Sequence, residues 1–231
     1  MSRIILIETS TELCSTALVE DGAVISARES SEPRSHASKT ALFVKEMLDE
    51  RHLKVSDCDA VCVSKGPGSY TGLRVGVSTA KGLCFAAGLP LIAIDTLQTL
   101  VWQAFEEGLV PEGCRYIVPM IDARRMEVYT ATYTATDKGR VGEISPEIIA
   151  EGSFAKELSE GPVLFIGDGA DKCREVLTHP NAVFAQECPK ASSMLRPAIE
   201  ALNEKRFENT AYFEPFYLKQ FVATVSRKSL F

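Results

Sequence analysis

The sequence has no long hydrophobic run. Its 231 residues contain no apolar segment that approaches the roughly 18 residues needed to cross a bilayer, so a membrane-spanning helix is not expected. The apolar run at residues 4–7 is followed at once by Glu8, and it is shorter than the roughly 7–15 residues of a signal-peptide core. We therefore predict a buried strand at this position and no membrane partner.

Paired cysteines are also missing. Seven cysteines, an odd number, stand at positions 14, 58, 62, 84, 114, 173 and 188, and none belongs to a CxxC pair. This pattern excludes the disulfide framework of a small secreted domain and indicates a reducing compartment, so we expect a cytoplasmic protein. Cys58 and Cys62 have no further metal ligands nearby in the sequence, and we predict no zinc site.

Blocks of basic residues are absent. The chain has 25 lysines and arginines against 31 aspartates and glutamates, which gives a net charge of −6. A protein that binds RNA by itself generally carries a basic patch, because contacts to phosphates dominate the affinity. If the function of the chain concerns RNA, a partner must supply most of the binding.

Motifs of catalytic sites are missing as well. The histidines, His36, His52 and His179, form no HxxxH or HExxH pattern, and there is no GxSxG motif. Asp122 and Arg124 place opposite charges at the end of a predicted strand, which indicates a local ion pair and leaves a functional role open. We predict no catalytic residue and no metal ligand in this chain.

The hydrophobic pattern predicts two α/β lobes. Residues 1–100 are expected to form the N-terminal lobe and residues 101–231 a reduced C-terminal lobe. The predicted strands are 4–7, 15–19, 23–29, 60–64, 91–94, 116–121, 126–136 and 163–166, with a tight hairpin at Asp21-Gly22. The predicted helices are 35–52, 70–87, 171–178 and 191–206.

Two loops have the composition of anion-binding turns. The first places Glu8, Ser10 and Thr11 directly after the strand at 4–7, so a carboxylate and two hydroxyls share one tight turn. The second contains Gly66, Pro67, Gly68 and Ser69 and leads into a helix whose first amides would face an anion. It lacks the GK[ST] ending of a Walker loop. Each loop also has a purely structural alternative: a polar hairpin turn for the first, and a strand-to-helix turn for the second.

The helices predicted at 35–52 and 70–87 are more apolar than one buried face requires. The second helix carries only Arg74 and Lys81 as charges, and such a helix needs cover on nearly every side. We therefore predict an exposed two-helix patch that binds a partner protein, formed by Phe43, Met47, Leu73, Gly76, Val77 and Ala80. The alternative is that both helices pack within one fold. An arginine at Gly76 or Ala80 would prevent pairing in the first case and unfold the chain in the second.

Four segments resemble the TsaB family, formerly called YeaZ. They are IETSTELCSTAL at 7–18, KGPGSYTGLRVGVSTAKGL at 65–83, IDARRMEVY at 121–129 and EPFYLK at 214–219. The resemblance covers essentially the whole chain, and the second segment is its most specific part. It implies a two-lobed actin-like fold of the sugar kinase and Hsp70 type with a reduced second lobe. It also implies that the two loops are degenerate phosphate loops, and that an adenosine-binding glycine pair is reduced to Gly167-Asp168-Gly169.

The resemblance also implies a function. Family members act with the catalytic paralogue TsaD and the ATPase TsaE to place threonylcarbamoyl on the adenosine next to the anticodon in tRNA. TsaD binds its catalytic metal through an HxxxH pair, whereas the stretch after Thr96 here, LQTLVWQAF, contains no histidine. The resemblance thus implies a non-catalytic scaffold subunit that pairs with TsaD through the two-helix patch and reaches tRNA through the complex. It implies no cofactor on this chain alone, with ATP or ADP held in the complex.

Three other functions compete with this interpretation. An autonomous actin-like ATPase or kinase would need a complete second lobe. A glycoprotease-like metallopeptidase of the M22 type would need the missing metal histidines. A homodimeric regulatory protein would use the same helices to bind a second copy of the chain.

Overall fold

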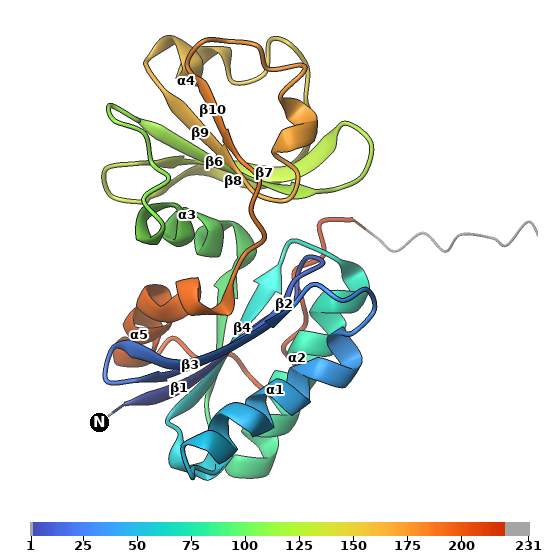
Figure 1. Ribbon diagram of the computed structural model, residues 1–231, viewed down its shortest axis with the longest axis vertical. Helices are drawn as coiled ribbons and strands as arrows, with labels where there is room; N and C mark the ends of the chain where they lie inside the picture. The colour runs from blue at the N-terminus through green and yellow to red at the C-terminus, as the bar shows by residue number, and fades with distance from the viewer. Residues whose placement is uncertain (1, 220–231) are drawn as a thin grey trace, which may run out of the picture.

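The computed structural model describes residues 2–219, which form two α/β lobes stacked along the long axis of the molecule (Figure 1). Each lobe contains a five-stranded sheet, and helix α3 (Thr96–Glu106) lies between the lobes. Among these residues no helix combines the length and the apolar character needed to span a bilayer. The predicted two-lobed α/β architecture is confirmed.

The N-terminal sheet consists of β1 (Arg3–Glu8), β2 (Cys14–Glu20), β3 (Ala23–Ser30), β4 (Ala60–Gly66) and β5 (Leu91–Asp95). Its order is β3-β2-β1-β4-β5; β1 to β3 are antiparallel, and β4 and β5 continue the sheet in parallel with β1. The strands β1 and β4 are apolar along nearly their whole length because both faces of the sheet are covered. Asp21 and Gly22 turn the hairpin with φ angles of 47° and 80°, as their sequence predicted.

Two long helices cover one face of this sheet (Figure 1). They are α1 (His36–Glu50) and α2 (Tyr70–Ala87), with the short turn η1 (Val55–Asp57) after α1. Ser69 caps the start of α2 by accepting a hydrogen bond from the amide of Gly72, and Gly88 ends the helix in the left-handed conformation with φ of 69°. Both boundaries of α2 agree with the sequence prediction.

The C-terminal sheet repeats the topology of the first. It consists of β6 (Tyr116–Asp122), β7 (Glu127–Thr134), β8 (Arg140–Ile148), β9 (Val163–Ile166) and β10 (Ala182–Ala185), in the order β10-β9-β6-β7-β8. Three antiparallel strands are again followed by two parallel ones. The connecting elements are much shorter here, since only α4 (Ala155–Ser159) and η2 (Asp171–Cys173) stand where the first lobe has α1 and α2. The C-terminal lobe is therefore reduced, as predicted.

The chain returns to the first lobe after β10, which corrects the predicted domain boundary. The turn η3 (Ala191–Met194) and helix α5 (Leu195–Asn203) pack their apolar side chains against Ile4, Leu6 and Ile92 on the face of the N-terminal sheet opposite α1 and α2. Residues 191–203 thus belong to the N-terminal lobe, although the sequence placed all of 101–231 in the second lobe. The sequence analysis also missed α3, β8 and β10, and the helix predicted at 171–178 is only the three-residue turn η2.

Candidate functional site

The first predicted anion-binding loop begins where β1 ends. Glu8 is fully buried, and its Oε1 accepts a hydrogen bond of 2.6 Å from the amide of Ser10. Its Oε2 has no hydrogen-bond partner among the described residues. Burial raises the pKa of Glu8 to about 7, because the charged carboxylate loses its hydration there. The carboxylate of Glu8 thus stabilises the turn of the loop to which it belongs.

The second loop packs directly on the first. The amide of Ser69 donates to the carbonyl of Ser10 at 2.7 Å, and Thr9 Oγ1 donates to the carbonyl of Gly72 at 2.8 Å. A Cβ at Gly68 would lie 2.4 Å from the Ser10 carbonyl oxygen, and one at Gly72 would lie 2.1 Å from that of Thr9. Only glycine allows such an approach, so the two loops touch each other through their backbones.

A cleft of about 790 Å³ lies between the lobes beside these loops. Five of the predicted loop residues line it: Ser10, Thr11, Pro67, Gly68 and Ser69. Glu8 and Gly66 do not. The C-terminal lobe contributes Asp122, Arg124 and Asp168. The structure thus brings most of the predicted loop residues to one place.

The glycine turn of the C-terminal lobe closes on its own sheet. Gly167 has φ of 141°, and a Cβ there would lie 2.1 Å from the carbonyl oxygen of Met120. Asp168 Oδ1 accepts a hydrogen bond of 2.9 Å from the amide of Asp122. Burial, with the nearby Asp122 carboxylate, raises the pKa of Asp168 to about 6. This turn is therefore fastened to β6.

Asp122 and Arg124 do not form the local ion pair that the sequence indicated. Asp122 Oδ1 accepts the backbone amide of Arg124 at 2.8 Å, and its charge is paired with Lys172. Arg124 has a positive φ of 71° in the tight turn between β6 and β7. The prediction of the ion partner was wrong because the carboxylate caps the turn and faces η2, which is distant in sequence.

Some backbone amides of the two loops are already bonded within the protein. The amide of Ser10 binds Glu8, that of Ser69 binds the Ser10 carbonyl, and that of Gly72 binds Ser69 Oγ at 3.3 Å. An anion at a helix N-terminus needs free amides, so these three do not serve a phosphate in this arrangement. The hydroxyls of Ser10 and Thr11 are buried without a partner in the described part of the chain.

A C-terminal strap, residues 208–219, lines the cleft and connects the lobes. It pairs with β5 through Glu208, and the amide of Phe216 donates to the carbonyl of Lys65 at 2.7 Å. Tyr217 packs against Tyr70 in a tilted ring pair with centres 4.9 Å apart. At its end, Lys219 forms an ion pair with Glu127 of β7. In the sequence, residues 214–219 stand out only by their family resemblance, and the pairing of this strap with β5 and β7 could not be predicted from local patterns.

The six side chains predicted to form the exposed patch are buried. Phe43, Met47, Leu73, Gly76, Val77 and Ala80 all face the interior of the N-terminal lobe. Gly76 lies so close to the first loop that a Cβ would be 2.2 Å from Thr9 Oγ1. The predicted exposure of these residues was wrong because the sheet and the first loop cover the faces of α1 and α2 on which they lie. The variants Gly76→Arg and Ala80→Arg would therefore disturb the core.

A different face of the same helices is exposed. Phe85 of α2 is 89% exposed and Leu42 of α1 is 48% exposed. The same helices have further exposed positions with small or short side chains, and we call the whole set the outer helix face: Ala41, Leu42, Thr71, Ser78, Gly82, Phe85 and Ala86. This face could have been predicted from the sequence, where a large apolar residue stands alone among polar or small residues.

Comparisons with known proteins agree with this architecture. The family model described as TsaD, tRNA N6-adenosine threonylcarbamoyltransferase, matches residues 29–226. The chain is 32% identical over 230 residues to the tRNA threonylcarbamoyladenosine biosynthesis protein TsaB of Escherichia coli K12, and the match covers 96% of each chain. It is 28% identical to the solved structure of YeaZ from Pseudomonas aeruginosa, with a TM-score of 0.80 over 94% of this chain and 100% of that one.

A more distant likeness concerns the fold alone. The inorganic polyphosphate/ATP-glucomannokinase of an Arthrobacter strain superposes with a TM-score of 0.50 at 13% identity, over 89% of this chain and all of that one. The two duplicated sheets and this neighbour confirm the predicted actin-like, sugar kinase type of fold.

Proposed function

Since the chain belongs to the TsaB family, we propose that it acts in tRNA threonylcarbamoyladenosine biosynthesis as a non-catalytic subunit paired with a TsaD-type protein. The complex also takes up the ATPase TsaE and binds tRNA, so that this acidic chain contributes little RNA contact of its own. Its place of action is the cytoplasm, where its tRNA substrate is modified.

The observation that carries this proposal is the closure of the two loops on each other. Three backbone amides of these loops are bonded within the protein: that of Ser10 to Glu8, that of Ser69 to the Ser10 carbonyl at 2.7 Å, and that of Gly72 in the cap of α2. A chain closed in this way supports a partner rather than turning over a nucleotide. ATP or ADP is held in the complex, with groups that the partner supplies.

The outer helix face supports the pairing. It combines two exposed large side chains, Leu42 and Phe85, with small residues that let another helix approach closely. Because α1 and α2 are firmly packed on the sheet below, this face is presented as a rigid surface. Partner binding through these two helices is thus retained, with other side chains than those first predicted.

The test uses size-exclusion chromatography with light scattering on the chain alone and mixed with its cognate TsaD-type protein. We expect a one-to-one complex that is lost in Gly82→Arg, because a Cβ at Gly82 meets no atom within 4 Å and the arginine would project from the outer helix face. The matched control is Gly152→Arg in the C-terminal lobe, where a Cβ also meets nothing within 4 Å. It should pair like the wild type.

Two results would contradict the proposal. ATP turnover by the purified chain, without a complex, would favour the autonomous ATPase or kinase. A stable dimer of the chain that excludes the TsaD-type protein would favour the homodimeric regulator.

A further inference from the structure

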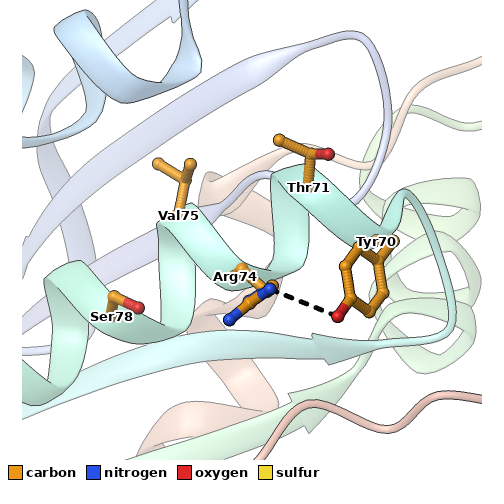
Figure 2. Close-up of a pocket in the computed structure, with 5 residues that line it drawn as sticks. All are labelled: Tyr70, Thr71, Arg74, Val75 and Ser78. Carbon is orange, nitrogen blue, oxygen red and sulfur yellow. Dashed lines mark hydrogen bonds between the residues drawn. The ribbon is translucent and has the colours of Figure 1, made fainter. Parts of the chain in front are cut away.

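One charged side chain stands on the outer surface of α2 within a small hollow. Arg74 lies with Tyr70, Thr71, Val75 and Ser78 around a depression of about 370 Å³ (Figure 2). Figure 2 shows the guanidinium turned along the helix toward the hydroxyl of Tyr70. The hollow adjoins the outer helix face, since Thr71 and Ser78 belong to both.

The guanidinium is held in position by aromatic contacts. Arg74 Nη1 donates to the hydroxyl of Tyr70 at 3.2 Å, and its Cζ lies 5.3 Å from the centre of that ring. Tyr70 in turn packs against Tyr217 of the C-terminal strap in a tilted pair, with ring centres 4.9 Å apart. An arginine fixed by ring contacts loses less freedom when it binds a planar acceptor.

The charge of Arg74 has no counterion in the described part of the chain. Its hydrogen bond and its ring contact both involve neutral Tyr70, and no carboxylate of residues 2–219 forms an ion pair with it. An arginine stays protonated at every physiological pH. If a partner helix covers this surface, Arg74 loses water, and a buried charge is tolerated only when an opposite charge or several acceptors meet it.

We propose that the hollow is a carboxylate-binding site in which Arg74 receives an aspartate or glutamate side chain from a helix of the catalytic partner. This inference rests on the proposed function, and it names the residue that selects the partner. Val75 and Thr71 beside Arg74 supply short-range packing for the stem of that side chain. Tyr217 is a positioning residue, because it acts on the partner only through Tyr70 and Arg74.

A second copy of the chain that packs its α2 against this α2 would not supply the carboxylate. The exposed surface of α2 carries no acidic residue, since Arg74 and Lys81 are the only charges of this helix. Lys81 is engaged with the strap through the carbonyls of Ala211 and Phe213, at 3.3 and 2.9 Å. Two copies that met through α2 would therefore bring positive charge together without a carboxylate from either helix.

The experiment measures the dissociation constant of the full chain and its cognate TsaD-type protein by isothermal titration calorimetry, at low and at high salt. Arg74→Gln should weaken the complex about tenfold or more, because it removes one partner of a charged pair in the interface. Arg74→Lys should recover part of the loss, since the ammonium lacks the planar fork. The wild-type complex should also lose more affinity with added salt than the Arg74→Gln complex does.

A matched control and a double-variant cycle isolate the mechanism. Arg174→Gln is the control, because Arg174 also lies over an aromatic ring, 4.8 Å from the centre of Phe184, but in the C-terminal lobe. It should bind like the wild type. Tyr217→Ala should weaken the complex in the wild-type background and have no effect in Arg74→Gln, because its role passes through Arg74.

The outcomes separate the inference from the proposed function. A complex that persists at full affinity in Arg74→Gln but is lost in Gly82→Arg would overturn the inference and leave the proposed function standing. The absence of any complex with the wild-type chain would overturn both. Self-association that is lost in Arg74→Gln and unaffected by the TsaD-type protein would assign the hollow to a second copy and overturn the inference.

Discussion

The two lobes share one strand order but use it differently. In each lobe the first strand ends in a carboxylate, Glu8 in β1 and Asp122 in β6, and a glycine turn follows the fourth strand. In the N-terminal lobe that turn leads into the 18-residue helix α2, whereas in the C-terminal lobe it leads into the three-residue turn η2. The same topology therefore supports a helical surface in one lobe and a closed, short-looped sheet in the other.

The difference is clearest at the two carboxylates. Glu8 is fully buried beneath the first loop, while the side chain of Asp122 is 44% exposed and paired with Lys172. Packing of α2 against the first loop seals Glu8 from water, and no comparable helix covers Asp122. The long helix thus determines both the burial of the first loop and the outer surface of the N-terminal lobe.

The largest expected effect tests how α2 is packed. Gly76→Arg should prevent folding or destabilise the chain by more than about 4 kcal/mol, because its side chain would displace Thr9 from contact with the helix. Gly152→Arg, at an open position in the C-terminal lobe, should change the free energy of unfolding by less than about 0.5 kcal/mol. Urea denaturation followed by circular dichroism measures both. A folded Gly76→Arg chain of normal stability would show that α2 packs less closely on the first loop than the contact between Gly76 and Thr9 indicates.

Alanine substitutions in the glycine turns should lower the free energy of unfolding by similar amounts in the two lobes. A Cβ at Gly68 would lie 2.4 Å from the Ser10 carbonyl oxygen, and one at Gly167 would lie 2.1 Å from that of Met120. We expect Gly68→Ala and Gly167→Ala each to lower the free energy of unfolding by about 3 kcal/mol. Gly82→Ala is the control, because it faces open space in α2 and should be neutral or stabilising. A harmless Gly167→Ala would mean that only the N-terminal turn is tightly packed.

The burial of Glu8 should make the stability of the chain depend on pH. The pKa of Glu8 is raised from 4.5 to about 7 in the folded state, so the folded chain retains a proton that the unfolded chain has lost in this range. Stability should therefore fall as pH rises from 4.5 to about 7, by about 3 kcal/mol from this group, and stay lowered above it. Glu8→Gln should remove this dependence, whereas Asp122→Asn should leave it in place.

Urea titrations of the wild type and both variants across this pH range provide the measurement. Because a buried amide adds its own constant cost, the informative quantity is the change with pH of the stability difference between wild type and Glu8→Gln. A difference that stays constant would show that Glu8 is charged throughout and hydrated better than its burial indicates.

Local signals in the sequence predicted most of the helices and strands of the N-terminal lobe. The hairpin at Asp21-Gly22, the apolar strands β1 and β4 and both ends of α2 follow from turn chemistry, burial on both faces and capping. The helix α3 and the strand β8 were missed for different reasons. Helix α3 follows β5 without an intervening loop, so its favourable N-cap residue, Asp95, is also the last residue of the strand. Strand β8 carries Gly142, Pro146 and several charges on an exposed edge.

The candidate site was predictable only in part. The residues of the two loops were identified because glycines and hydroxyls cluster in the sequence, but their mutual closure depends on the register between segments about 60 residues apart. Which faces of the helices are buried could not be predicted from their composition. The small residue Gly76, for example, is covered by the first loop and not by a partner. The path of the strap could not be predicted either, because it depends on where β5 and β7 lie in space.

The smallest expected effect concerns the connection between the lobes. Lys219 of the strap pairs with Glu127 of β7 and lies 6.0 Å from the centre of the Tyr129 ring, but it is 43% exposed, so solvent weakens the attraction. Lys219→Gln should therefore lower the free energy of unfolding by less than about 1 kcal/mol. Its effect should appear instead in hydrogen exchange of the strap, whose amide at Phe216 is bonded to the N-terminal lobe. Faster exchange at Phe216 with unchanged global stability would show that Lys219 fastens the strap to the second lobe. Exchange as slow as in the wild type would show that the backbone contacts to the N-terminal lobe hold the strap by themselves.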